Sequence, residues 1–286
     1  MKKIALGLGI LIASVCGVLA QVSVEVTLDQ DQFLPGETMN AEVRITNRSG
    51  QTLHFGVDNT WLTFEIESKE GYVVVKLGDA PVKGEFSLES SKRAIKRVDL
   101  APYFRFPKEG RYMVTAVVTI KDWNQQITSP PRSFDIIRAA KLWEQQVGIP
   151  NPPGVTNRPP EVRIYTLYQA NYLRTHLMLY VQCSDSRGKI YRVFPIGPML
   201  SFGQPEPQVD RFSNLHVLYQ DGPRSFNHTI VDPDGTVLLR HEYDMTPRPK
   251  LALNAHGDLQ VVGGTRRITS RDIPAPKTAE NDVHAP

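Results

Sequence analysis

The residues that could do chemistry lie mainly in the second half of the 286-residue chain. Asp232-Pro233-Asp234-Gly235 opens like a calcium-binding loop, because carboxylates two positions apart can converge on one hard cation. The glutamate that completes an EF-hand loop would fall at position 243, which is Tyr243. A Pro-Asp-Gly hairpin turn accounts for the same residues more simply. We therefore predict a turn here and no metal site.

The histidines and the common catalytic motifs also give no site. The chain has seven histidines: His54, His176, His216, His228, His241, His256 and His284. None lies two positions from another, which is the spacing that places two imidazoles on one face of a strand. The chain also lacks the serine-hydrolase elbow, the His-Glu-x-x-His motif and both common glycine-rich nucleotide loops. We expect no catalytic residue, no metal ligand and no cofactor.

Three other groups of residues could still form a ligand site. Seven tyrosines lie among the arginines of the second half, where they could stack on sugars or bases: Tyr165, Tyr168, Tyr172, Tyr180, Tyr191, Tyr219 and Tyr243. The backbone amides and two guanidiniums of Gly263-Gly264-Thr265-Arg266-Arg267 could hold an anion. We favour core-edge tyrosines and a solvated basic turn. An enzyme would require carboxylates such as Glu206, Asp210 and Asp244 to meet in one pocket.

Cys183 is the one cysteine that follows the first twenty residues. The alternation of Leu177–Cys183 places its thiol on the same strand face as Leu177, Leu179 and Val181. We expect a buried small hydrophobe here, in preference to a nucleophile or an intermolecular cross-link.

The charge balance argues against a polyanionic partner. The chain holds 33 Lys+Arg and 30 Asp+Glu, and without the two lysines of residues 1–20 it holds 31 basic and 30 acidic groups, a net +1. Nucleic-acid-binding domains are usually strongly basic. We therefore expect no nucleic-acid partner.

The first twenty residues predict a secretory signal peptide. Two lysines and an apolar run, Ile4–Val15, precede Val18-Leu19-Ala20, which has the form of a cleavage site. We predict cleavage after Ala20 and a periplasmic or extracellular protein with no later membrane span. Acylation at Cys16 is the alternative, but the valine before that cysteine fits poorly where a small residue is required.

Residues 21–138 show the pattern of about eight short strands. Val22, Val24, Val26 and Leu28 alternate with polar residues, and a Pro-Gly turn at 34–37 separates them from a second alternating run at 39–45. Period-two alternation predicts half-buried antiparallel strands, and this density of strands predicts a sandwich.

Phe33–Glu37, Val43–Gly50 and Phe106–Val114 resemble segments of bacterial immunoglobulin-like and fibronectin type III-like domains. The resemblance covers residues 21–138 and implies a two-layer sandwich with a tyrosine corner. There Tyr112 packs inward and its hydroxyl bonds to the upstream backbone. With Trp143–Pro150, most of the mature chain resembles secreted bacterial proteins that begin with such a domain. The resemblance implies no functional residue. The domain has no cysteine pair, so apolar packing must hold it.

Residues 139–160 predict a short helix followed by a proline-stiffened linker. In Ala139–Val147, Leu142 and Gln146, and likewise Trp143 and Val147, are four positions apart, and Gly148 suits a helix C-cap. Five prolines follow between positions 150 and 160. We therefore predict a domain boundary near residue 150.

Residues 161–270 contain a weak internal repeat. Val209–Leu218 matches Leu253–Val262 at an offset of 44, and Gly188 and Gly235 close similar hairpins 47 apart. Propeller blades repeat at about 40–45 residues, but a closed propeller takes about 4–8 blades. Two units predict a compact sandwich or open sheet, and chains that associate into a ring are the alternative. We expect residues 271–286 to be disordered.

These observations predict an all-β protein: an immunoglobulin-like β-sandwich followed by an antiparallel β-repeat domain. We expect an exported, non-catalytic binding or structural protein of the bacterial cell envelope, because the fold offers loops and edges and no recognised reactive group. Its partner would be a protein or an envelope polysaccharide, and self-association into a homo-oligomer is open. The alternatives are an inhibitor or accessory domain acting on an extracellular enzyme, and then an enzyme.

Overall fold

The computed structural model describes residues 21–149, 161–173 and 175–274. The regular elements of these ranges are 23 strands and two short 3-10 helices, so the predicted all-β class is confirmed. No helix in the described part of the chain has the length and apolar character needed to cross a bilayer. The predicted signal peptide, the proline-rich segment at 150–160 and the tail from 275 onward lie outside the described residues.

The first domain consists of two layers, antiparallel except for the parallel pair of β2 and β12, and of two small strand pairs. One layer has the order β1-β3-β8: β1 (Val22–Leu28), β3 (Asn40–Asn47) and β8 (Arg93–Asp99). The other has the order β11-β10-β12-β2, with β5 also paired to β10: β2 (Gln32–Phe33), β5 (Leu62–Ser68), β10 (Gly110–Ile120), β11 (Gln125–Thr128) and β12 (Arg132–Ile136). The pairs are β4 (Leu53–Phe55) with β7 (Phe86–Leu88), and β6 (Val75–Lys76) with β9 (Phe104–Arg105). The 3-10 helices are η1 (Ala101–Tyr103) and η2 (Lys121–Trp123).

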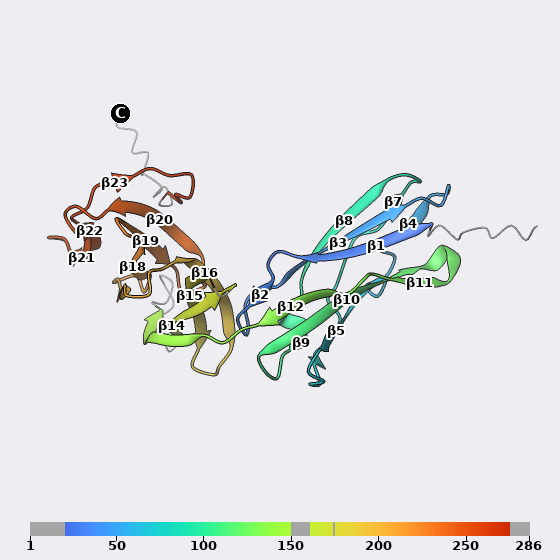
Figure 1. The fold of residues 1–286 in the computed structure, drawn as a ribbon, viewed down its shortest axis with the longest axis horizontal. Coiled ribbons are helices and arrows are strands. Elements are labelled where there is room, and N and C mark those ends of the chain that lie inside the picture. Colours follow the sequence, from blue (N-terminus) through green and yellow to red (C-terminus); the bar gives the residue numbers. More distant parts are fainter. Residues whose placement is uncertain (1–20, 150–160, 174, 275–286) are drawn as a thin grey trace, which may run out of the picture.

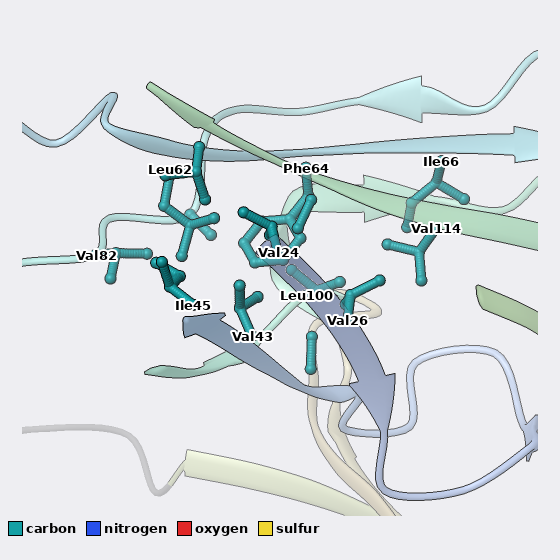
Figure 2. Packing of buried hydrophobic residues seen from close by; sticks show 14 of the residues in the cluster. Val24, Val26, Val43, Ile45, Leu62, Phe64, Ile66, Val82, Leu100 and Val114 are labelled. Atoms are coloured by element: carbon teal, nitrogen blue, oxygen red, sulfur yellow. The ribbon is translucent and has the colours of Figure 1, made fainter. Parts of the chain in front are cut away.

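Apolar packing between the two layers holds the first domain together. Alternate residues of β1 and β3 are buried, as the period-two pattern predicts. Figure 2 shows Val24 and Val43 of one layer beside Leu62 and Phe64 of the other. Full burial of one such side chain stabilises the fold by about 1.5–3 kcal/mol, so this cluster can replace the absent disulfide.

Tyr112 occupies the position that the tyrosine-corner pattern predicts. The residue is fully buried on β10, where Phe106 and Phe134 pack against its ring. Its hydroxyl donates a 2.6 Å hydrogen bond to the Lys108 carbonyl, four residues upstream. The bond fixes the start of β10 relative to the loop before it.

We predict that Tyr112→Phe lowers the free energy of unfolding by about 1 kcal/mol, because the hydrogen bond from the tyrosine hydroxyl to the Lys108 carbonyl is lost. Urea denaturation of the wild type and the variant measures this change in the free energy of unfolding. Tyr72→Phe is the matched control, since Tyr72 is exposed and the structure gives its hydroxyl no hydrogen bond. Equal midpoints for Tyr112→Phe and the wild type would contradict the prediction.

The predicted helix at 139–147 is wrong: these residues lie in strand β13 (Ala140–Ile149), which pairs with β14 (Glu161–Tyr172). Trp143 and Val147 do share a face, and both pack against the core of the second domain. A spacing of four positions fits one face of a strand as well as one face of a helix, so it does not separate the two. This segment forms a strand because its backbone hydrogen-bonds to β14. The domain boundary therefore lies at 137–139, before β13, and not near residue 150.

The second domain consists of two sheets packed through one apolar core. The first sheet has the order β13-β14-β15-β16, with β15 (His176–Asp185) and β16 (Ile190–Pro198). The second has the order β17-β18-β19-β20-β23: β17 (Glu206–Val209), β18 (Leu215–Gly222), β19 (Ser225–Val231), β20 (Val237–Asp244) and β23 (Arg266–Arg267). A hairpin of β21 (Lys250–Leu253) and β22 (Leu259–Val262) packs on the outer face of the second sheet through Leu251. This is the first of the two arrangements, a compact sandwich or an open sheet, that the presence of only two repeat units predicted.

The structural repeat unit is one hairpin, and it is half as long as the repeat unit predicted from the sequence. Asp185, Asp210, Asp232 and Asn254 each begin a turn in which the side-chain Oδ1 accepts the backbone N–H groups two and four residues later, at 2.7–3.0 Å. The last three lie 22 positions apart, so the offset of 44 spans two hairpins. Because Oδ1 of Asp232 is engaged in its own turn, the predicted hairpin interpretation of 232–235 is confirmed.

The prediction that disorder starts at residue 271 is wrong for residues 271–274. Ile273 forms an antiparallel bridge with Arg240 of β20, and Asp272 accepts a 2.7 Å hydrogen bond from Arg266. Residues 271–274 therefore belong to the second domain. The ion pair between Asp272 and Arg266 of β23 fixes this segment, although its sequence has no periodicity.

The Pro-Gly turn at 34–37 joins the two domains. Figure 1 shows β2 and β12 on the side of the first domain that faces the second. Leu34 packs with Tyr180 and Val193 of the second domain. Beneath the turn, the buried Glu37 carboxylate accepts hydrogen bonds from the Leu34 amide at 2.7 Å and the Gln30 side-chain amide at 2.6 Å. Burial raises the pKa of Glu37 to about 7.

We predict that Glu37→Gln flattens the pH dependence of stability. A folded pKa of about 7, above the ordinary 4.5, means that Glu37 favours folding most below pH 4.5 and loses that contribution as the pH rises to 7. The wild type should lose about 1–3 kcal/mol more than the variant between pH 5 and pH 8. Chemical denaturation at several pH values tests this, and parallel curves for the two proteins would rule it out.

Candidate functional site

Polar side chains replace apolar ones at one end of the inner face of the second sheet. Leu215 and Val217 of β18 lie in the apolar core, but Tyr219, next on the same face, carries a hydroxyl. Asn227 lies opposite Tyr219, and Glu242 lies opposite Asn227. Directly opposed residues of antiparallel strands share a face, so the three form one polar row across β18, β19 and β20.

A close contact between the sheets marks this change from apolar to polar. The Tyr219 hydroxyl donates a 2.7 Å hydrogen bond to the Ile196 carbonyl of β16. A Cβ atom at Gly197 would lie 2.4 Å from that hydroxyl oxygen, closer than side-chain atoms can approach. Glycine at 197 is therefore what allows the tyrosine to reach the first sheet.

A pocket of about 230 Å³ lies beyond this contact, between the two sheets. Its walls are the residues Met178, Pro195, Ile196, Gly197 and Pro198 of the first sheet, Tyr219, Asn227 and Arg240 of the second, and Arg271 of the C-terminal segment. One side is thus mainly apolar and the other carries an amide and two guanidiniums. Pockets that hold drug-sized ligands measure roughly 300–1,000 Å³, so this one suits a smaller molecule or one unit of a larger one.

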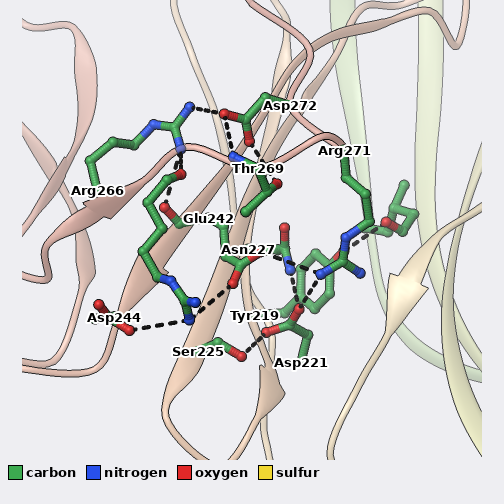
Figure 3. A network of polar contacts seen from close by, with 12 residues as sticks. Tyr219, Asp221, Ser225, Asn227, Glu242, Asp244, Arg266, Thr269, Arg271 and Asp272 are labelled. Atoms are coloured by element: carbon green, nitrogen blue, oxygen red, sulfur yellow. Dashed lines mark hydrogen bonds and ion pairs between the residues drawn. The ribbon is translucent and has the colours of Figure 1, made fainter.

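A network of ion pairs holds Arg271 at the pocket wall (Figure 3). The Arg271 guanidinium lies 3.3 Å from Glu242 Oε2 and 3.9 Å from Asp221 Oδ2, and both carboxylates are buried. Asp221 also accepts hydrogen bonds from the Ser225 hydroxyl, at 2.6 Å, and from the Asn227 amide. Neither acidic residue lines the pocket, so Arg271 is neutralised from behind.

The predicted basic turn at 263–267 supplies part of this network. Arg266 bonds to Asp272 at 2.7 Å, and Arg267 lies 3.4 Å from Glu242 and 3.5 Å from Asp244. The two guanidiniums point to different carboxylates and do not converge on one anion. The expectation of a basic pair exposed to solvent is therefore wrong for Arg266, whose side chain is 30% exposed and ion-paired.

Arg240 differs from the other arginines of this region. Its Nε is buried and has no hydrogen-bond partner, and no acidic group of the described residues lies within ion-pair distance of its guanidinium. Its backbone is fixed by the bridge to Ile273. A buried donor without an acceptor costs free energy of folding. Arg240 also lines the pocket, where its guanidinium can donate hydrogen bonds to an oxygen ligand.

The carboxylates that an enzyme would require do not come together. Glu206 lies 3.8 Å from Arg248, Asp244 contacts Arg267, and Asp210 begins a turn. Each therefore has different neighbours.

Cys183 and most of the singled-out tyrosines are structural. Cys183 is fully buried in the core, and burial raises the pKa of its thiol to about 12, so the predicted silent cysteine is confirmed. Tyr165, Tyr180 and Tyr219 are also buried, and burial raises their pKa values. Tyr191 stacks against Arg163, 4.1 Å from its ring centre. Of the seven tyrosines, Tyr219 lines the inter-sheet pocket.

The structure also brings together two histidines that the sequence analysis separated. His216 Nδ1 lies 3.1 Å from His228 Nε2, and His216 Nε2 lies 3.3 Å from Asp210 Oδ2. The pair is buried beneath the β21–β22 side of the second sheet, and burial lowers the pKa of His228 to about 3. The search for a spacing of two missed it because the residues lie on neighbouring strands, and the β18–β19 register would have revealed it. Among the described residues no group of three or more His, Cys, Asp or Glu side chains is arranged to hold a metal ion.

We predict that His228→Gln reduces the acid sensitivity of the fold. A folded pKa near 3, below the ordinary 6.5, gives stability that is complete above pH 6.5 and is lost as the pH falls toward 3. Between pH 7 and 4.5 the wild type should lose about 1–3 kcal/mol more than the variant in urea titrations. The exposed His256→Gln is the control, and a similar flattening in that variant would contradict a specific role for His228.

Comparisons with known proteins leave the function to be argued from this chain. No family model and no curated protein matches it. Among solved structures, it is similar to the crystal structure of Spo0M, a sporulation control protein from Bacillus subtilis, at 9% identity over 71% of this chain and 80% of that one. The TM-score is 0.31, too low to transfer fold or activity.

Proposed function

We propose that this chain is an exported, non-catalytic binding protein of the bacterial cell envelope, and that the pocket between the sheets of its second domain is the recognition site. Export rests on the leader pattern of residues 1–20. The main observation that supports a binding role is this pocket, which is lined by Arg240, a residue whose buried Nε–H has no hydrogen-bond partner.

The state of the reactive side chains supports binding over catalysis. The Cys183 thiol, with a pKa of about 12, stays protonated at neutral pH and lies in the apolar core. His228, with a pKa of about 3, stays neutral and buried. Neither group lines the pocket. A general base or nucleophile needs a pKa near the working pH and access to the substrate, and these residues have neither.

The form of the pocket supports a polysaccharide partner. Sugar rings present apolar C–H faces and polar edges, which match the proline and methionine wall on one side and the amide and guanidiniums on the other. A protein partner would bury a larger surface, typically about 800 Å² on each side. The pocket therefore suits one unit of an envelope polysaccharide.

A second candidate is an accessory or inhibitory role toward an extracellular enzyme. The observation that favours it is a run of exposed apolar side chains beside β6: Val73 is 80% exposed, Val75 48% and Leu77 54%. Exposed apolar residues at alternate positions of an extended segment are typical of a surface that binds another protein.

We predict that envelope glycan fragments stabilise the mature chain without being changed by it. A ligand at about 100 times its Kd raises the free energy of unfolding by about 2.7 kcal/mol. Thermal denaturation with fragment pools measures the stabilisation, and mass spectrometry of the recovered fragments detects chemical change. Saturable stabilisation with intact fragments is expected. Cleaved or modified fragments would show that the protein is an enzyme.

The export part of the proposal has its own test. N-terminal sequencing of the protein recovered from the envelope should begin at Gln21, the residue after the predicted cleavage site. An acylated N-terminus at Cys16 would replace the soluble form by a lipoprotein, and an intact Met1 in the cytoplasm would overturn export.

A further inference from the structure

We infer that the inter-sheet pocket binds its ligand through a single carboxylate, carried by an acidic sugar unit of the uronic acid class, and that Arg240 is the residue that binds this carboxylate. The inference rests on the proposed binding function and names the ligand chemistry of the same pocket.

The first step is the state of Arg240. Arg240 lines the pocket, its buried Nε has no acceptor, and the described residues offer its guanidinium no carboxylate within ion-pair distance. By contrast, Arg266, Arg267 and Arg271 each contact at least one acidic group. An unpaired charge and an unpaired donor in one partly buried side chain are unfavourable until an anion arrives.

The second step is the choice of a carboxylate. A guanidinium presents parallel N–H groups that match the two oxygens of a carboxylate, and charge-assisted bonds of this kind are among the strongest in proteins. A dianion such as phosphate would bring a second negative charge close to Arg271, whose own charge Asp221 and Glu242 already balance. One negative charge pairs with Arg240 alone.

The third step is the body that carries the carboxylate. The pocket volume of about 230 Å³ is the space of about eight water molecules, which fits one compact ring. Pro195, Pro198 and Met178 offer an apolar wall to the face of that ring. Asn227 lines the opposite wall, and although one of its N–H groups is engaged by Asp221, its amide oxygen can accept a hydrogen bond from a ring hydroxyl. A sugar ring with one carboxylate combines these features.

Isothermal titration calorimetry on the mature chain tests the inference with D-glucuronate as the probe and D-glucose as its uncharged counterpart. We expect glucuronate to bind at least about tenfold more tightly than glucose, because the sugars differ in the group that faces Arg240. Arg240→Met should remove that difference and Arg240→Lys should keep part of it. Arg224→Met, a charge removal at an exposed arginine of the β18–β19 turn, should leave both affinities unchanged.

A stability measurement separates ligand binding from a structural role. Because Arg240→Met removes an unpaired buried donor, the variant without ligand should melt at or above the wild-type temperature. A marked fall in melting temperature for both Arg240→Met and Arg240→Lys would show that Arg240 holds the fold, and would overturn the inference.

Two further probes identify which part of the inference fails, if it fails. Acetate binding as tightly as glucuronate would overturn the sugar class, and inorganic phosphate binding more tightly would overturn the carboxylate. If neutral glycan fragments bind but glucuronate does not, the inference is wrong and the proposed function stands. If the fragments are chemically changed, the proposed function itself is wrong.

Discussion

The contact between Tyr219 and the backbone at Gly197 is the constraint on which the second domain depends. On one side of it the inner faces of both sheets are apolar and pack as a core. On the other side the first sheet remains mainly apolar, and the second sheet and the C-terminal segment carry amide, carboxylate and guanidinium groups. The tyrosine suits this boundary because its ring is apolar and its hydroxyl bonds to the Ile196 carbonyl. Its size keeps the two sheets at a fixed separation, so the space beyond it remains a pocket of defined shape.

The ion pairs behind the pocket position side chains more than they stabilise the fold. Moving two charges out of water costs about as much as their attraction returns, so a buried pair adds little net stability. The chain Asp221–Arg271–Glu242–Arg267 nonetheless fixes each guanidinium in one orientation. This places Arg271 at the pocket wall with its charge balanced, and leaves Arg240 as the cation there without a partner.

The hairpin repeat explains why the weak similarity in the sequence suggested a propeller blade. Four connections of the second domain turn on an aspartate or asparagine whose side chain accepts hydrogen bonds from two backbone amides, and two successive such hairpins span the offset of 44. These turns occur at every second connection of an antiparallel meander, so they gather at one end of the sheets, and the pocket is built at the other end.

Local chemistry in the sequence determined the all-β class, the alternation of β1 and β3, the Tyr112 corner, the 232–235 turn and the buried Cys183. Each follows from residues close together in the chain: period-two burial, turn-forming side chains, or an aromatic four residues after its acceptor. The tertiary structure alone decided that 140–149 is a strand, that His216 meets His228, and that Arg240 lacks a partner. These depend on which strands pair and in what register, because a spacing of four fits a helix and a strand equally, and a contact between strands leaves no fixed spacing in the chain.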